Sequence, residues 1–349
     1  MKQLGSKLTR SSALIGVATL ALSAPAFADV TLSYATNTPP TNIRGEAETI
    51  FLDAIEEFSD GRITVDAYWA GSLIEGDETL GAIRDGVVDM GFVNINYYPN
   101  ELLLNSAFNL FVEGPTNYDD IMWAHNTIYE EIPELGAELG EFNQRRIYSY
   151  GVTPYAGVFT SPVESFDDFE GQRVRAASQW FLNLLEGVDA VPVSMPWPDL
   201  YQALETGSID GVFTNVDGIN RSSLDEAAPN VFVTRDIWLA VPFNVTINEN
   251  VWAGLDEDLQ EALIQASEAA QERFAERYHD ILDGIYAAQE EAGYNVVEAS
   301  AEDIELFANL PQVQANYDSW VESAEGQGAE DAAGILTAME DIVSQAVNR

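Results

Sequence analysis

The sequence has no cysteine and only two histidines, and both scarcities restrict its chemistry. Without cysteine the chain forms neither disulfides nor thiolate metal sites, so its stability must come from core packing alone. His125 and His279 stand in acidic helical stretches with no other histidine nearby, which gives no basis for a zinc site or a Ser-His-Asp triad. We therefore predict a protein with no metal, no other cofactor and no catalytic activity. A secreted acidic hydrolase is the alternative.

Positive charge is also scarce, and lysine is missing from every position after Lys7. The chain has 15 Lys plus Arg against 58 Asp plus Glu, a formal net charge of -43. Such a charge excludes nucleic acid and anionic lipid surfaces as partners. It would oppose compaction at ordinary ionic strength, whereas near 1 M salt the screening length falls to about 3 Å. The composition therefore indicates a halophilic source, and an acidic protein from an ordinary source is the alternative.

Long apolar runs are missing except near the N-terminus. Three cations precede an apolar run at residues 13–22, and the small-residue sequence Ala-Phe-Ala ends at Ala28. This order is typical of a secretory signal peptide, and the run is too short to span a bilayer. We predict a signal peptide at residues 1–28 and an exported mature chain that is not inserted in the membrane. Loss of three cations and no acids from a net charge of -43 leaves that mature chain at -46.

The apolar pattern alternates between strand and helix along most of the chain. Residues 30–34 and 63–68 alternate as strands do, and a helical spacing runs between them to Phe58. A strand at 90–93 completes the first unit, and a similar order recurs at 171–220. A mature chain of roughly 320 residues is long enough for about two domains. The sequence therefore predicts an α/β protein with two lobes.

Two crossing strands and one long helix are expected to join the lobes. A strand at residues 145–151 leads out of the first unit, and a return passage is expected near 238–245. Two passages make a hinge with a cleft between the lobes. The spacing from 256 to 292 predicts one helix of about 54 Å, which is longer than one lobe is wide. A surface helix is predicted at 118–139. The predicted lobes are lobe I, residues 29–152 plus 241–280, and lobe II, residues 153–240 plus 281–349.

The stretch 171–220 carries the main candidate binding residues. A short strand places Arg173 and Arg175 on one face, and a later strand ends at Asn215. Open α/β sheets bind ligands at the carboxyl ends of their strands. A planar guanidinium can hold a carboxylate by two parallel hydrogen bonds, as lysine cannot. We therefore predict that Arg175 and Asn215 contact the ligand. Arg173 is the competing arginine, and a salt bridge or a turn is the structural alternative.

Further candidates come from both units. Thr36, Asn37 and Asn94 follow predicted strand ends in the first unit. Tyr155 and Trp238 are candidates for the apolar side of the pocket. A turn role is the alternative for the polar residues, and a core position is the alternative for the aromatic ones.

Four segments carry a resemblance to a known family. They are 171–175 (GQRVR), 193–211 (VSMPWPDLYQALETGSIDG), 68–73 (YWAGSL) and 83–92 (IRDGVVDMGF). These segments resemble the solute-binding subunits of tripartite ATP-independent periplasmic (TRAP) transporters, the DctP type, and the likeness covers most of the mature chain. The resemblance implies a periplasmic-binding-protein-like fold, capture of an organic acid by lobe closure, and delivery to membrane permease subunits. It maps the family's carboxylate-binding arginine onto Arg175 and a ligand-contacting asparagine onto Asn215, and it implies a periplasmic location.

One departure from the family pattern concerns the ligand. Many relatives have a second basic residue before the arginine strand, but no residue between Arg146 and Arg173 is cationic, and Tyr155 stands in that region. This favours a monocarboxylate with an apolar or hydroxylated body, while a dicarboxylate or a sugar acid stays open. A ligand-loaded partner of a sensor, rather than of a transporter, would share the same fold.

Overall fold

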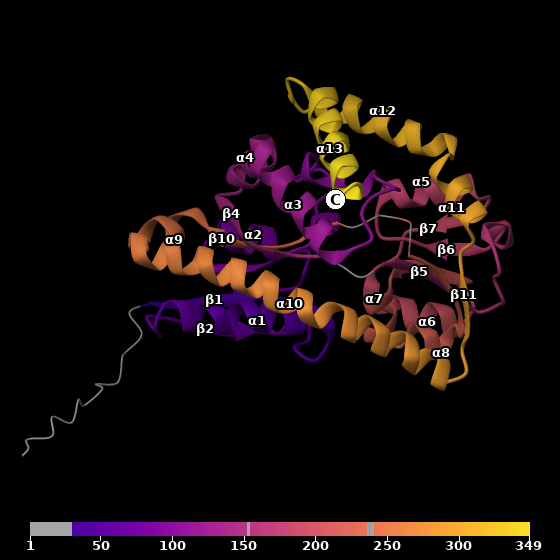
Figure 1. Ribbon diagram of the computed structural model, residues 1–349, viewed down its shortest axis with the longest axis horizontal. Coiled ribbons are helices and arrows are strands. Elements are labelled where there is room, and N and C mark those ends of the chain that lie inside the picture. Colours follow the sequence, from indigo (N-terminus) through magenta and orange to yellow (C-terminus); the bar gives the residue numbers. More distant parts are fainter. Residues whose placement is uncertain (1–29, 152–153, 236, 238–240) are drawn as a thin grey trace, which may run out of the picture.

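The computed structural model describes residues 30–151, 154–235, 237 and 241–349 (Figure 1). The predicted signal peptide, residues 1–28, and the candidate Trp238 lie outside the described residues. Across the described part of the chain, every helix is too short or too polar to span a bilayer.

The first sheet has five strands in the order β2-β1-β3-β10-β4. Strands β2 and β3 run parallel to β1, whereas β10 is antiparallel to both of its neighbours. The strand predicted at 145–151 and the return passage therefore meet as a pair within this sheet. The strands are β1 (Val30–Ala35), β2 (Ile63–Tyr68), β3 (Met90–Val93), β4 (Gln144–Tyr150) and β10 (Phe243–Asn248).

The second sheet has six strands in the order β11-β9-β5-β8-β6-β7. The chain passes from the first sheet to the second between β4 and β5 and returns between β9 and β10. The predicted α/β architecture of two lobes joined by two passages is thus confirmed. The strands are β5 (Tyr155–Phe159), β6 (Arg173–Arg175), β7 (Val191–Val193), β8 (Gly211–Asn215), β9 (Asn230–Thr234) and β11 (Asn295–Glu298).

Helices cover both sheets and continue to the C-terminus. Those of the first sheet are α1 (Ile43–Phe58), α2 (Thr79–Arg84), η1 (Ile95–Tyr97), η2 (Asn105–Asn109), α3 (Tyr118–Glu131) and α4 (Pro133–Glu141). Those of the second are η3 (Phe166–Phe169), α5 (Gln179–Gly187), η4 (Trp197–Asp199), α6 (Leu200–Glu205), α7 (Val216–Arg221) and α8 (Leu224–Ala227). The last are α9 (Glu249–Gly254), α10 (Glu257–Glu291), α11 (Ala301–Ala308), α12 (Pro311–Gly326) and α13 (Ala332–Val347).

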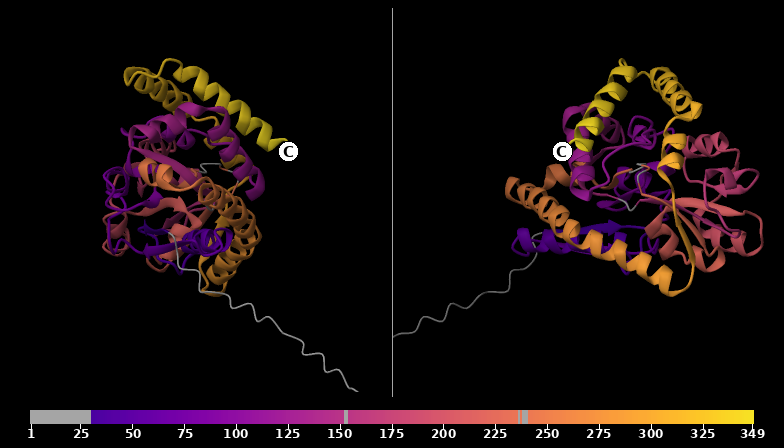
Figure 2. Two further views of the ribbon diagram at one scale, coloured as in Figure 1. Left: turned by 90° about the vertical axis from the view of Figure 1, so that its left-hand side faces the viewer. Right: turned by 45° about the vertical axis from the view of Figure 1, so that its right-hand side comes forward.

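The long helix α10 spans both lobes, as predicted. Its 35 residues give a length of about 52 Å, and it extends from α9 in the first lobe to the region of α8 in the second (Figures 1 and 2). Near its middle, Arg277 pairs with Glu46 of α1 at 2.8 Å. Towards its end, the amide of Gln289 donates to Asp225 of α8 at 2.9 Å. The helix therefore contacts helices of both lobes.

The helix predicted at 118–139 is interrupted, and this prediction is wrong in that respect. The structure has two helices, α3 and α4, which meet at Ile132 and Pro133. Proline has no N–H to donate to the preceding turn, and it disfavours helical geometry in the residue before it. Ile132 accordingly has a φ of -119° and a ψ of 81°, and Pro133 begins the second helix.

The C-terminal helices contact elements of both sheets (Figure 2). Helix α13 packs on α3, and the Trp320 indole N–H of α12 donates to the Leu103 carbonyl at 2.8 Å. Helix α12 also packs on α5, where the Asn316 amide donates to the Trp180 carbonyl at 3.0 Å. The predicted boundaries of the two lobes stay a prediction.

Candidate functional site

Arg175 ends strand β6 and has no acid partner among the residues that the structure describes. Its side chain is buried, with 6% exposure, and its Nε donates to the Met195 carbonyl at 3.1 Å. Its Nη1 is buried and has no acceptor among the described residues. Burial lowers the pKa of Arg175, but an arginine still stays charged at neutral pH. A buried guanidinium N–H without an acceptor is costly, so this group is suited to an anion from outside the chain.

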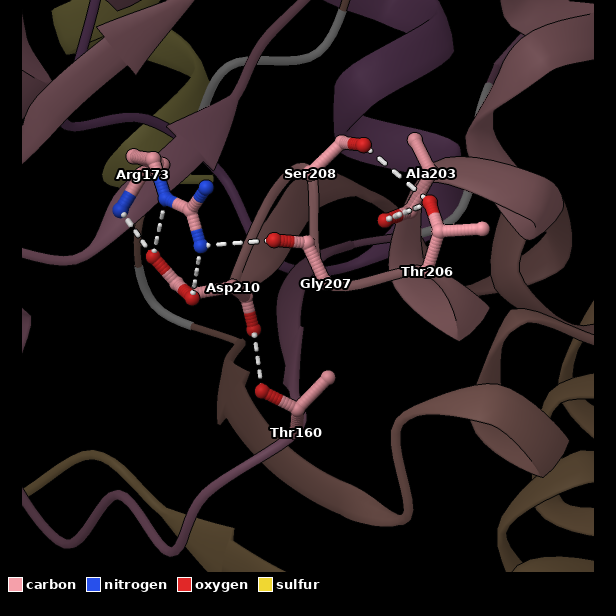
Figure 3. A network of polar contacts seen from close by, with 7 residues as sticks. All are labelled: Thr160, Arg173, Ala203, Thr206, Gly207, Ser208 and Asp210. Carbon is pink, nitrogen blue, oxygen red and sulfur yellow. Dashed lines mark hydrogen bonds and ion pairs between the residues drawn. The ribbon is translucent and has the colours of Figure 1, made fainter.

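Arg173, the competing arginine, is engaged within its own lobe (Figure 3). Its guanidinium donates to both carboxylate oxygens of Asp210, at 2.8 and 2.7 Å, and to the Gly207 carbonyl at 2.8 Å. The hydrogen bond from Arg173 lowers the pKa of Asp210. Arg173 is therefore part of a surface ion pair that joins β6 to the loop before β8.

Asn215 and Tyr155 lie opposite each other at the end of the second sheet, and Arg175 is the register partner of Val212, three residues before Asn215. Strand β8 pairs with both β6 and β5, and Asn215 is the register partner of Tyr155. Both side chains are buried. Burial raises the pKa of Tyr155, while the charges of Arg44 and Arg175 oppose that rise. Of the predicted residues, the structure thus pairs Asn215 with Tyr155 and places Arg175 two strands from Tyr155 in the same sheet.

The first-lobe candidates lie at the ends of β1 and β3, which are neighbours in the first sheet. Thr36 is buried, and its hydroxyl accepts the backbone N–H two residues ahead at 3.0 Å. The Asn94 carbonyl oxygen likewise accepts an N–H two residues ahead, at 3.1 Å, and caps η1. The Asn37 amide reaches across to the Tyr97 hydroxyl at 3.4 Å. Thr36 and Asn94 therefore shape the local turns, and Asn37 contacts an aromatic side chain that the sequence analysis did not single out.

An ion pair that the sequence analysis did not predict joins the two lobes. Arg44, in the first turn of α1, pairs with Asp217, in the first turn of α7. Both side chains are buried, and the Arg44 guanidinium lies 4.3 Å from the centre of the Phe243 ring. Burial lowers the pKa of Arg44, but the attraction of Asp217 outweighs it and leaves a raised pKa. The pair joins helices of the two lobes.

Arg221, at the end of α7, is the third arginine of this region. Its Cζ lies 4.7 Å from the centre of the Trp197 ring, and the Cζ of Arg175 lies 5.6 Å from the same ring. Burial, together with the charge of Arg44, lowers the pKa of Arg221 to about 10, although the charge of Asp217 opposes this shift.

The phenol of Tyr97 interacts electrostatically with all three arginines. We call Arg44, Arg175, Arg221, Asp217 and Tyr97 the arginine cluster. It offers a cationic site with aromatic walls and is suited to binding an anion.

The sequence analysis did not single out Arg44 or Arg221. The only sequence signal for them is that cations are scarce in this chain, so that each arginine is a candidate for a specific role. Arg44 and Asp217 are 173 positions apart, and no motif relates either of them to Arg175. The described residues contain no group of three His, Cys, Asp or Glu side chains that could hold a metal ion.

The family match and two similar proteins agree in pointing to bacterial solute-binding proteins. Residues 34–322 match the family described as bacterial extracellular solute-binding protein, family 7 (DctP). The ectoine-binding periplasmic protein TeaA of Halomonas elongata is 27% identical over 335 residues, 92% of this chain and 93% of that protein. The C4-dicarboxylate-binding periplasmic protein DctP of Rhodobacter capsulatus is 25% identical over 73% of this chain and 76% of its own length.

A solved structure shows the same fold at lower identity. The TRAP periplasmic solute-binding protein from Desulfovibrio salexigens with bound orotic acid superposes with a TM-score of 0.80 at 15% identity, over 91% of this chain and 99% of that one. Because the family match extends over most of the described residues, the chain belongs to the DctP family of bacterial extracellular solute-binding proteins, as its sequence resemblance predicted.

Proposed function

We propose that this protein is the solute-binding subunit of a TRAP transporter and binds an organic acid in the arginine cluster. The observation that carries the proposal is the state of Arg175. In a chain with 58 acidic residues, this buried guanidinium has an N–H without an acceptor and no carboxylate partner among the described residues. An anionic ligand would supply the missing acceptor.

The proposed binding mode assigns a role to each neighbour. Arg175 holds the ligand carboxylate, and Asn215 and Tyr155 bind it from the same end of the second sheet. Asn37 contacts the ligand from the first sheet together with Tyr97, while Thr36 and Asn94 hold the turns that carry them. Closure of the lobes excludes water and strengthens each charged hydrogen bond.

The proposed cellular role follows from the family. We infer that the loaded protein delivers its ligand to membrane permease subunits in the periplasm and performs no catalysis. This inference is supported by the relative TeaA, which is described as an ectoine-binding periplasmic protein. A ligand-loaded partner of a sensor stays the alternative, and co-purification with permease subunits or with a sensor distinguishes the two.

A ligand screen with two variants tests the binding role. Thermal shift of the mature protein at high salt should show stabilisation by some organic acids, because a ligand of the native state raises the melting temperature. Arg175→Ala should abolish that shift and leave the unliganded melting temperature close to that of the wild type. Arg173→Ala is the matched control, because this arginine lies two residues away on the same strand but pairs with Asp210. Equal shifts in wild type and Arg175→Ala would refute the proposal.

A further inference from the structure

Arg175 and Arg221 differ from the other arginines of the described residues in their hydrogen-bond partners. Among the described residues, nine of the twelve arginines have a carboxylate within salt-bridge distance. Arg146 has none but donates to the Asn126 amide oxygen at 3.0 Å. Arg175 and Arg221 remain, and each has a buried guanidinium nitrogen without an acceptor, Nη1 of Arg175 and Nε of Arg221.

The position of Arg221 is fixed by the packing of α7 against Trp197. The Trp197 indole N–H donates to the Ser222 hydroxyl at 2.9 Å. A Cβ built on Gly218 would lie 2.9 Å from the Trp197 ring, so only glycine permits this close approach. Gly218, Arg221 and Ser222 therefore share the face of the helix that meets the indole.

The guanidinium groups of Arg175 and Arg221 are close enough to bind one small molecule. Their Cζ atoms lie 5.6 and 4.7 Å from the same ring centre, so they are separated by no more than about 10 Å. Tyr97, from the first lobe, interacts electrostatically with both of them. This span suits a small organic acid that carries an anionic group at each end.

The charges of the cluster leave two positive charges to be balanced. Asp217 pairs with Arg44, and among the described residues no carboxylate lies within salt-bridge distance of Arg175 or Arg221. Glu48 of α1 is also fully buried, and its two oxygens accept the Tyr34 and Tyr150 hydroxyls at 2.7 and 2.8 Å. This acid is therefore engaged with tyrosines and forms no ion pair with Arg175 or Arg221 within the described part of the chain.

We propose that Arg221 is a second anion-binding residue, so that the preferred ligand is an organic acid with two anionic groups, one on Arg175 and one on Arg221. This inference rests on the proposed function and makes its ligand class specific. It replaces the monocarboxylate that the sequence favoured, because the second cation comes from α7 and not from the segment before β6.

A diacid and its monoamide have nearly the same shape but differ by one negative charge, so a comparison of their affinities tests the second charge alone. Calorimetry at high salt would compare succinate, glutarate and adipate with succinamate, glutaramate and adipamate. A charged hydrogen bond that the monoamide lacks should make the best diacid about ten- to a hundredfold tighter than its monoamide. In Arg221→Gln this ratio should fall to about one, with the monoamide affinity little changed. Arg221→Lys should keep part of the preference, because the charge remains.

Arg146→Gln is the matched control. Arg146 is also half-buried, lies 4.2 Å over an aromatic ring and lacks a carboxylate partner. This variant should keep the full preference for the diacid. A wild-type protein that binds monoamides as tightly as diacids, or an Arg221→Gln variant that keeps the preference, would overturn the inference and leave the proposed function standing. Failure of all six acids to bind, with an acid of a single charge from the thermal screen binding wild type and Arg221→Gln equally well, would likewise overturn only the inference.

Discussion

Replacing Asp217 by Asn should destabilise the unliganded protein through the ion pair that joins the lobes. Both partners are buried, with 2% exposure for Asp217 and 8% for Arg44. Removing one partner of a buried pair leaves an uncompensated charge and costs about 3–5 kcal/mol. Unfolding entropy is about 2.1 cal/mol/K per residue, so for roughly 320 residues this loss lowers the melting temperature by about 4–7 °C.

The assay is thermal unfolding of wild type, Asp217→Asn and Asp85→Asn at low and high salt. Asp85 pairs with Arg84 at 2.8 Å, and both side chains are exposed, so this control removes the same charge from the surface. Its melting temperature should stay close to that of the wild type, because exposed pairs contribute little. The loss in Asp217→Asn should persist at high salt, which screens buried pairs weakly. Equal melting temperatures for the two variants would refute the reasoning.

Two other substitutions test the surroundings of the cluster. Burial raises the pKa of Glu48 from 4.5 to about 7, so stability should fall by on the order of 3 kcal/mol as pH rises through that window. Denaturant unfolding of Glu48→Gln should show no such fall, and parallel pH profiles would contradict the assignment. Gly218→Ala should cost about 1–3 kcal/mol and weaken ligand binding by displacing Trp197. In Gly254→Ala the new Cβ meets no atom within 4 Å, and an equal loss there would refute the steric argument.

The fold was readable from the sequence because its elements are set by local patterns. The strand at 63–68 and the strand at 90–93 appear with the predicted bounds, since alternation and flanking glycines define them. The long helix was readable from its continuous apolar spacing. The break at Pro133 was also encoded locally, because a proline constrains the residue before it.

The site was readable only in part, because convergence in space leaves little trace in sequence. Arg175 could be proposed from its place at a strand end and from the family resemblance. Its distinction from Arg173 depends on the fold, because Asp210, in the loop before β8, pairs with Arg173, whereas no acid of the described residues pairs with Arg175. Arg44 and Arg221 come from helices far apart in the chain, so only the folded structure shows that they share one aromatic and acidic neighbourhood.

The central claim is that the Arg175 guanidinium binds a visiting carboxylate. A crystal structure of the mature protein with an organic acid found by the thermal screen tests it most directly. We expect a carboxylate oxygen within hydrogen-bond distance of Nη1 of Arg175, the atom that has no acceptor among the described residues. A ligand carboxylate bound elsewhere, with Arg175 paired to an aspartate or glutamate of its own chain, would contradict the account.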